Sequence, residues 1–170
     1  KTIIGARGVL QISGTSDKGL HRVLSNAGRA LWSGGRLAFY DGTFNNRAGA
    51  VLEIACDQPF ADGVLNNEGT VVKVSGSGTT AFASMYRSPA PLNNRGVVEV
   101  QSGTLQLNGT GTHTGSFVVT TNATLHLANG THTVEVRWQQ TRGMRLVHAL
   151  PRVSLSTDAV NLTQQLELPP

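Results

Sequence analysis

The chain repeats one short phrase, in which an asparagine and a nearby glycine or alanine precede two aliphatic residues that flank one outward residue. The asparagines of this phrase are Asn26, Asn46, Asn67 and Asn94, so successive copies lie 20, 21 and 27 residues apart. Such steps are too short for independent domains and match one coil of a solenoid. The sequence therefore predicts a stack of coils in which these four asparagines form a structural ladder.

Aliphatic residues also alternate with other residues, as at Val98, Val100, Leu105 and Leu107. Alternation with a period of two places these side chains on one face of successive strands, and glycine-bearing turns separate the strands. Further copies at residues 8–12 and 122–127 bring the number of coils to about six. We therefore expect an all-β fold, a parallel β-helix (β-solenoid) with at least two strands in each coil.

The alternation weakens from Arg137 onward, although residues 152–156 have the pattern of one more strand. We expect residues 1–136 to form the β-solenoid. The irregular segment 137–170 is expected to hold terminal strands or a linker to the rest of a longer chain.

The register of the coils predicts a row of outward side chains. This row comprises Gln11, Leu31, Glu53, Lys73, Glu99 and His126. Within it the charges of Glu53, Lys73 and Glu99 alternate in sign, which favours neighbouring rungs about 5 Å apart. To fit this register, the coils that begin at Asn46 and Asn67 each need one or two extra turn residues. The turn residues Glu68 and Arg95 offer a similar pairing.

Composition limits the possible functions. The net charge is +4, but the basic residues are dispersed along the chain, which argues against nucleic-acid binding. No stretch approaches the roughly 20 apolar residues of a membrane helix, and the first residues lack the apolar core of a signal peptide. We expect no membrane insertion, and any export signal would have been removed or would lie outside this segment.

Residues 92–105 and 122–127 carry the clearest repeats, and they resemble those of large secreted right-handed parallel β-helix proteins: adhesins, autotransporter passengers and related pectin-lyase-like surface proteins. The resemblance covers roughly residues 8–136. It implies an extracellular, secreted or cell-surface protein with a structural or adhesive role. It brings no catalytic motif, because such repeats are scaffolds shared by proteins with different activities.

A pectin-lyase-like enzyme would need clustered acidic residues, whereas the ten acidic residues here are scattered. Asp41, Asp57 and Asp62 are the candidates for a cation or sugar site, although Asp-Gly pairs usually make turns. The chain has no nucleophile elbow on a strand-to-helix turn, and its glycine-rich stretches lack the lysine and helix of a phosphate loop. We expect no enzyme activity, catalytic residue, metal or cofactor.

Two histidines occupy matching phrases, since His113 and His132 both lie between threonines and are 19 residues apart. They are expected to stack one rung apart as exposed, neutral side chains, with His126 on a different row. A metal site is the alternative, but no cysteine or carboxylate joins the histidines in the phrase. The threonines around them suggest an ice-binding array, which two such pairs are too few to form.

Four asparagines begin Asn-x-Thr sequons and are candidates for N-glycosylation: Asn108, Asn122, Asn129 and Asn161. The alternative is that these asparagines and threonines occur because they favour turns and strands, without being glycosylated. Cys56 is the only cysteine, and it either packs as a small apolar side chain or forms a bridge to another chain or segment.

Together these features predict a non-catalytic extracellular structural or adhesive module, such as a stalk segment or a subunit of a surface filament. Its expected partners are other segments of the same chain or neighbouring copies that stack on the solenoid ends, and possibly glycans. The alternative is a β-helix that binds or cleaves carbohydrate. That function calls for clustered carboxylates or stacked aromatic side chains, whereas Trp32, Tyr40 and Trp138 are dispersed.

Overall fold

The computed structural model describes residues 1–85, 90–129, 131–134, 153–156 and 160–161. Every regular element in these ranges is a β-strand. Within them, no helix is long and apolar enough to cross a membrane. The predicted all-β class is therefore correct.

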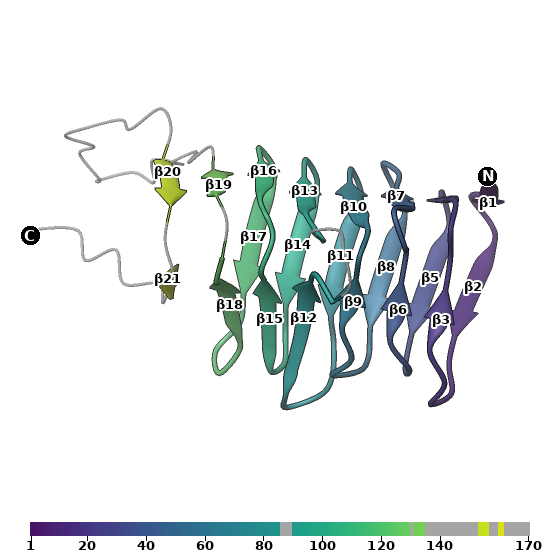
Figure 1. The fold of residues 1–170 in the computed structure, drawn as a ribbon, viewed down its shortest axis with the longest axis horizontal. Helices are drawn as coiled ribbons and strands as arrows, with labels where there is room; N and C mark the ends of the chain where they lie inside the picture. Colours follow the sequence, from purple (N-terminus) through teal and green to yellow (C-terminus); the bar gives the residue numbers. More distant parts are fainter. Residues whose placement is uncertain (86–89, 130, 135–152, 157–159, 162–170) are drawn as a thin grey trace, which may run out of the picture.

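Each coil contributes one strand to each of three parallel sheets, which run side by side along the solenoid (Figure 1). The first sheet contains β1 (Thr2–Ile4), β4 (Val23–Asn26), β7 (Thr43–Asn46), β10 (Val64–Asn67), β13 (Leu92–Asn94), β16 (Gly111–His113) and β19 (Thr131–Val134). The second sheet contains β2 (Val9–Ile12), β5 (Arg29–Trp32), β8 (Val51–Ile54), β11 (Thr70–Lys73), β14 (Val97–Val100) and β17 (Ser116–Val119). The third contains β3 (Lys18–Gly19), β6 (Leu37–Ala38), β9 (Phe60–Ala61), β12 (Thr79–Ala83), β15 (Thr104–Leu107) and β18 (Thr124–Leu127).

This arrangement confirms the predicted parallel β-solenoid of about six coils, with three strands in each coil. At the end opposite to β1, two further strands reverse direction (Figure 1). They are β20 (Val153–Ser156), antiparallel to β19, and β21 (Val160–Asn161), antiparallel to β18. Two short strands of the segment 137–170 thus extend the first and third sheets.

The core is a column of apolar side chains enclosed by the three sheets. Phe39, Phe60 and Phe82 stack in successive coils with ring centroids 5.1 and 4.8 Å apart. Leu52 and Ile54 in β8 point inward, as do Val98 and Val100 in β14. Side chains two positions apart in a strand lie on the same face. Burial of this continuous column is the main source of stability, since no single coil can enclose its own apolar face.

The predicted outward row is wrong at Lys73 and at His126. Val72, not Lys73, lies opposite Glu53 and Glu99, and Lys73 lies inward beside Ile54. His126 belongs to the third sheet, where it pairs with Gln106. The alternating row of charges therefore does not exist.

The error at Lys73 has its origin in the turn before β11. Two residues lie between Asn67 and Thr70 and two between Asn94 and Val97, so β11 and β14 pair directly without an added residue. Two extra residues occur in the turn after Asn46, where Gly49 adopts a left-handed conformation with φ of 79°, and in the corresponding turn of the first coil between Ile4 and Val9. The predicted insertion after Asn67 would have turned Val72 inward; without it, the inward position falls on Lys73.

Candidate functional site

A ladder of asparagine side chains runs through the interior along the first sheet. The Nδ2 atom of Asn26 donates to Oδ1 of Asn46 at 3.0 Å, Asn46 donates to Asn67 at 2.9 Å, and Asn67 donates to Asn94 at 2.9 Å. All four side chains are buried. The same Nδ2 atoms also donate to strand carbonyls of the second sheet: Val51, Thr70, Val97 and Ser116. This network gives the buried amide groups hydrogen-bond partners, and it links the first sheet of each coil to the second sheet of the next coil.

A second amide row lies beside this ladder on the outer face of the first sheet. Asn66 donates to Oδ1 of Asn45 at 3.0 Å, and Asn93 donates to Oδ1 of Asn66 at 2.9 Å. Thr112 continues the row, because its backbone N–H donates to Oδ1 of Asn93 at 3.2 Å. Sequence reasoning missed this row, although the three Asn-Asn doublets that contain Asn45, Asn66 and Asn93 were the signal for it.

A shallow groove follows the outer row and has a volume of about 380 Å³. Its lining combines the amides with two turn residues of opposite charge, Glu68 and Arg95. Glu68 also forms an ion pair with Arg47, with 3.8 Å between Nη1 and Oε2. Such a surface offers neutral donors and acceptors along the solenoid axis together with one carboxylate and nearby guanidinium groups. It fits a polar, uncharged or weakly anionic ligand better than an apolar one.

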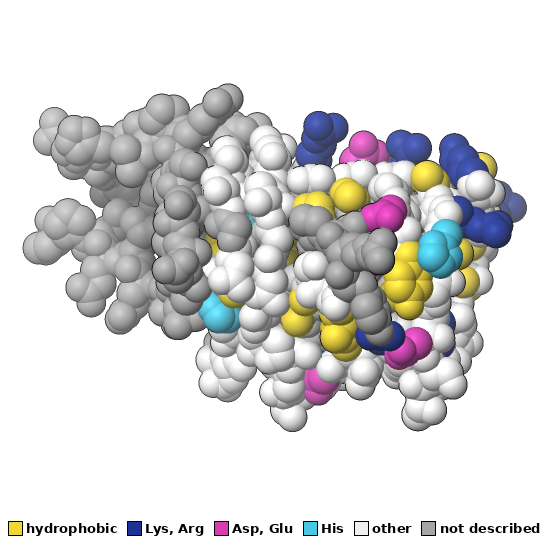
Figure 2. Space-filling model, viewed as in Figure 1, with side chains coloured by type: hydrophobic (Ala, Val, Ile, Leu, Met, Phe, Trp, Pro, Cys, Tyr) yellow, Lys and Arg dark blue, Asp and Glu magenta, His cyan; other side chains and the backbone are white. Residues whose placement is uncertain are grey.

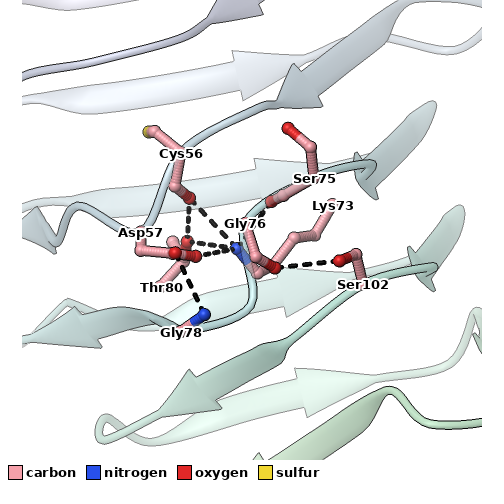
Figure 3. A network of polar contacts seen from close by, with 8 residues as sticks. All are labelled: Cys56, Asp57, Lys73, Ser75, Gly76, Gly78, Thr80 and Ser102. Carbon is pink, nitrogen blue, oxygen red and sulfur yellow. Dashed lines mark hydrogen bonds and ion pairs between the residues drawn. The ribbon is translucent and has the colours of Figure 1, made fainter.

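The most concentrated polar network surrounds Lys73 (Figure 3). The Nζ atom of Lys73 lies 2.7 Å from Oδ1 of Asp57, and it also donates to Thr80 Oγ1 at 3.2 Å. The carbonyls of Cys56 and Ser75 accept from the same nitrogen at 3.1 and 3.0 Å. Four acceptors therefore compensate for the removal of this ammonium group from water.

Asp57 anchors the turn that closes this network. Its Oδ2 accepts a hydrogen bond from the backbone N–H of Gly78 at 3.0 Å. Burial alone would raise the pKa of Asp57, but the hydrogen bonds from Lys73 and Gly78 and the charge of Lys73 hold the pKa below its ordinary value. The carboxylate is thus an ionised partner of Lys73, and Figure 3 shows Lys73 filling the space between Asp57 and the neighbouring carbonyls.

The other two acidic candidates lie in turns of adjacent coils. The backbone N–H of Asp41 donates to the carbonyl of Asp62 at 2.9 Å, and both residues adopt positive φ. Oδ1 of Asp62 accepts from the N–H of Met85 at 2.8 Å. In the part of the chain that the structure describes, no three metal-binding side chains come together. These contacts fit turn-forming aspartates better than a cation site.

The two matching histidines stack as expected but are buried rather than exposed. Their ring centroids lie 5.4 Å apart, and Nε2 of His113 lies 3.1 Å from Nδ1 of His132. His113 lies opposite Asn94 in the sheet, so it continues the inner amide ladder. The prediction of exposure is wrong because β16 turns this residue toward the core. His126 is half-buried on the third sheet.

The sequons differ in accessibility. Asn122 is exposed in a turn with φ of 68°, and Asn129 is exposed as well. Asn108 is half-buried, and its Oδ1 accepts a hydrogen bond from Gln106 at 2.7 Å. Asn161 lies in β21, where its backbone is paired opposite His126.

Cys56 is a free, half-buried cysteine that packs against the apolar core. Burial raises the pKa of its thiol above the ordinary value, since the deprotonated form is poorly solvated there. Figure 3 shows its sulfur directed away from the Lys73 network.

The two aromatic candidates that the structure describes, Trp32 and Tyr40, do not form a binding platform. Trp32 is buried and donates from Nε1 to the carbonyl of Gly35 at 2.8 Å, whereas Tyr40 stacks on His21 with ring centroids 4.7 Å apart. Trp138 lies outside the described residues. On the face shown in Figure 2 the acidic side chains of the described residues are few and separate, whereas most of the Lys and Arg side chains lie along its upper edge.

Comparison with known proteins found no matching family model, no matching curated protein and no matching solved structure. The fold defines the chain as a parallel β-solenoid repeat protein. The more particular kinship with adhesins or pectin-lyase-like proteins remains a resemblance of repeats.

Proposed function

We propose that this chain is a non-catalytic structural or adhesive module that works outside the cell as a rigid stalk segment or as part of a surface fibre. The observation that carries the proposal is the uninterrupted inner amide ladder from Asn26 to Asn94. It lies parallel to the solenoid axis and links four coils side chain to side chain. A scaffold that must keep its length under load benefits from such axial cross-linking.

The first coil supplies a surface for stacking. Within the described residues, the outer edges of β1, β2 and β3 pair with no other strand. Exposed N–H and C=O groups on three parallel edges can accept a further coil, either from another segment of the same chain or from a neighbouring copy. Ile3 and Val9 of this coil are 63% and 68% exposed, which adds apolar area beside those edges.

Electron microscopy of the native material, combined with mass spectrometry of the intact protein, tests this function. Stalks or filaments one solenoid wide, with glycan mass on the exposed sequons, are the expected result. A free, unmodified monomer of this length in native material would contradict the scaffold function.

A second candidate function, binding of carbohydrate, is favoured by the groove along the outer amide row. Amide side chains pair with sugar hydroxyls, and Arg95 beside the row suits a carboxylated sugar. No described aromatic side chain lines the groove, so the affinity is expected to be weak for a single sugar and to rise with chain length.

Glycan-array binding tests the second candidate, with Asn93→Ala and Arg95→Ala as variants of the groove. Arg22→Ala is the matched control, since Arg22 is an exposed arginine that does not line the groove. Binding that both groove variants weaken and the control retains would support a glycan site. Equal binding by all four proteins would exclude it.

A further inference from the structure

The histidine pair ends the inner amide ladder and joins the last parallel rungs of the first sheet. Nε2 of His113 and Nδ1 of His132 lie 3.1 Å apart, and the edge of Phe117 packs on His113 with 5.0 Å between ring centroids. The two histidines are 0% and 3% exposed. This single side-chain contact is the counterpart, between β16 and β19, of the amide-to-amide bonds between earlier rungs.

The hydrogen bond between the two rings limits which ring nitrogens can carry protons. One of the two facing nitrogens must donate and the other must accept, so the accepting ring must be neutral, and the bond is lost when both rings are protonated. The two remaining nitrogens, Nδ1 of His113 and Nε2 of His132, are buried, and neither has a hydrogen-bond partner of good geometry among the described residues. The backbone carbonyls of Leu107 and Asn129 lie close enough to His132 to favour a proton on that ring.

Among the described strands around the pair, no charged side chain can compensate for a proton added to it. The strands packed around it, β13, β15, β16, β17, β18, β19 and β20, contain no Lys, Arg, Asp or Glu, and their only other titratable side chain is His126 on β18. The residue paired with His113 on the neighbouring strand β13 is Asn94, whose side chain is uncharged. A charge on either imidazole would therefore be buried among neutral and apolar groups, which is strongly unfavourable.

We propose that His113 and His132 form an acid-sensitive latch, which holds β19 on β16 at neutral pH and releases this rung when the pair is protonated. Release would free the edge of β16, which is the same kind of parallel edge that the first coil presents at β1. Acid would thereby convert a closed end of the first sheet into one able to accept a strand. The latch depends on the fold alone and not on the function proposed above.

The direction of the pH effect follows from burial. Desolvation and the neighbouring His132 lower the pKa of His113 to about 4, and burial also lowers the pKa of His132. The open state, in which the rings are hydrated, therefore binds protons more readily than the closed state. Below the ordinary histidine pKa of about 6.5, each decrease of one pH unit raises the ratio of open to closed forms up to about tenfold for each histidine. This continues until the pH reaches the pKa of the folded state.

Hydrogen exchange measured by mass spectrometry between pH 7 and pH 4, corrected for the intrinsic pH dependence of exchange, tests the latch. We expect protection of the β16 and β19 amides to fall steeply with acid, while the amides of β7 and β10 in the middle of the same sheet keep theirs. In His113→Asn the pH dependence should be clearly weaker, because asparagine does not titrate and only His132 remains to bind a proton. His21→Asn is the matched control, since His21 is exposed in an early coil, and it should behave as the unmodified protein does.

A loss of protection that is the same in His113→Asn, or the absence of any loss in the unmodified protein, would overturn the proposal. If the variant fails to fold, nitrogen NMR of the imidazoles in the unmodified protein decides. Neutral rings at pH 6, with His113 titrating near pH 4 together with the loss of β19 protection, support the latch. Titration of both rings near pH 6.5 refutes it.

Discussion

The Nζ atom of Lys73, whose side chain is completely buried, lies 2.7 Å from Oδ1 of Asp57, whose side chain remains 35% exposed. A lysine thus occupies a core position of β11 that Ile54 and Val100 occupy in the neighbouring coils. The structure keeps it there by pairing it with the carboxylate of a turn and with three further oxygen acceptors. This pair fixes the irregular turn around Asp57 to the core of the solenoid.

Removing the carboxylate should be more harmful than removing the lysine. Asp57→Asn leaves a buried ammonium without its counter-charge and should lower the free energy of unfolding by about 3 kcal/mol, a value at the low end for buried pairs because Asp57 is partly exposed. Lys73→Met replaces the charge with an apolar side chain of similar length and should change the stability by about 1 kcal/mol or less. Urea denaturation of both variants measures the difference, and a greater loss in Lys73→Met would contradict this account.

The same pair predicts a pH dependence. Because the folded pKa of Asp57 lies below its ordinary value, its contribution is present above the unfolded pKa of about 4 and is lost as the pH falls through the folded pKa. Asp57→Asn should therefore lower the urea midpoint at pH 7 more than at pH 3. An equal decrease at the two pH values would mean that the charge of Asp57 is not what stabilises the turn.

The inner and outer amide rows should differ in their contribution to stability. Asn67→Ala removes a buried amide from the middle of the inner ladder and leaves the carbonyl of Val97 without its donor, so we expect a loss of about 3 kcal/mol. Asn66→Ala, the adjacent residue in the outer row, should lose about 1 kcal/mol or less, because water can replace its partners. Thermal unfolding of the two variants compares them, and equal losses would show that the inner ladder is not the stronger one.

Four glycines in the turns after the first sheet lie against the backbone of the neighbouring coil: Gly28, Gly69, Gly96 and Gly115. A Cβ atom added at Gly96 would overlap the carbonyl oxygen of Gly69 in the coil below, whereas one added at Gly5 meets nothing within 4 Å. Gly96→Ala should therefore destabilise the protein by about 2–3 kcal/mol, and Gly5→Ala should be tolerated. Urea midpoints of the two variants and the unmodified protein measure the difference in stability. A stable Gly96→Ala variant would mean that the coils can separate locally at little cost in free energy.

Cys56 should react slowly with thiol reagents in the folded protein. Its raised pKa lowers the thiolate fraction at pH 8, and its half-buried position limits access. Labelling with iodoacetamide before and after addition of urea compares the reaction rate of Cys56 in the folded and unfolded protein. The reaction should be faster after unfolding. Equally fast labelling of the folded protein would show that the thiol is available for a bridge to a partner.

Occupancy of the sequons should follow their exposure in a host that attaches N-linked glycans. Asn122 and Asn129 are exposed, so they should be modified more completely than Asn108, whose amide is half-buried and hydrogen-bonded by Gln106. Peptide mapping by mass spectrometry measures the occupancy at each site. Higher occupancy at Asn108 than at Asn122 would contradict this order.

The solenoid could be predicted because its repeat is local in the sequence. Each asparagine recurs at the spacing of one coil, and alternation identifies the inward residues wherever both flanking positions are apolar, as at Leu105 and Leu107. The predicted steps of 20, 21 and 27 residues separate stacked asparagines, and the longest step results from a longer connection between β12 and β13.

Alternation fails where the more apolar of two possible registers is not the one that the fold adopts. In the segment from Val71 to Val74, either Val71 with Lys73 or Val72 with Val74 can face inward, and hydrophobicity alone selects the second pair. The tertiary structure selects the first, because the two-residue turn after Asn67 must match the two-residue turn after Asn94 for the backbones to pair. The partners that make a buried lysine acceptable come from residues 56–80, which no local pattern links to it.

The sequence by itself determined the class, the number of coils and the spacing of the inner asparagine ladder, since all three follow from a repeat that each coil carries within itself. Only the tertiary structure decided which face each polar residue occupies. It buried the histidine pair, turned Lys73 inward and formed the outer amide row beside a groove. The physical reason is that burial in a solenoid depends on the register between coils, and that register is set by backbone hydrogen bonds across the stack rather than by any one coil's own side chains.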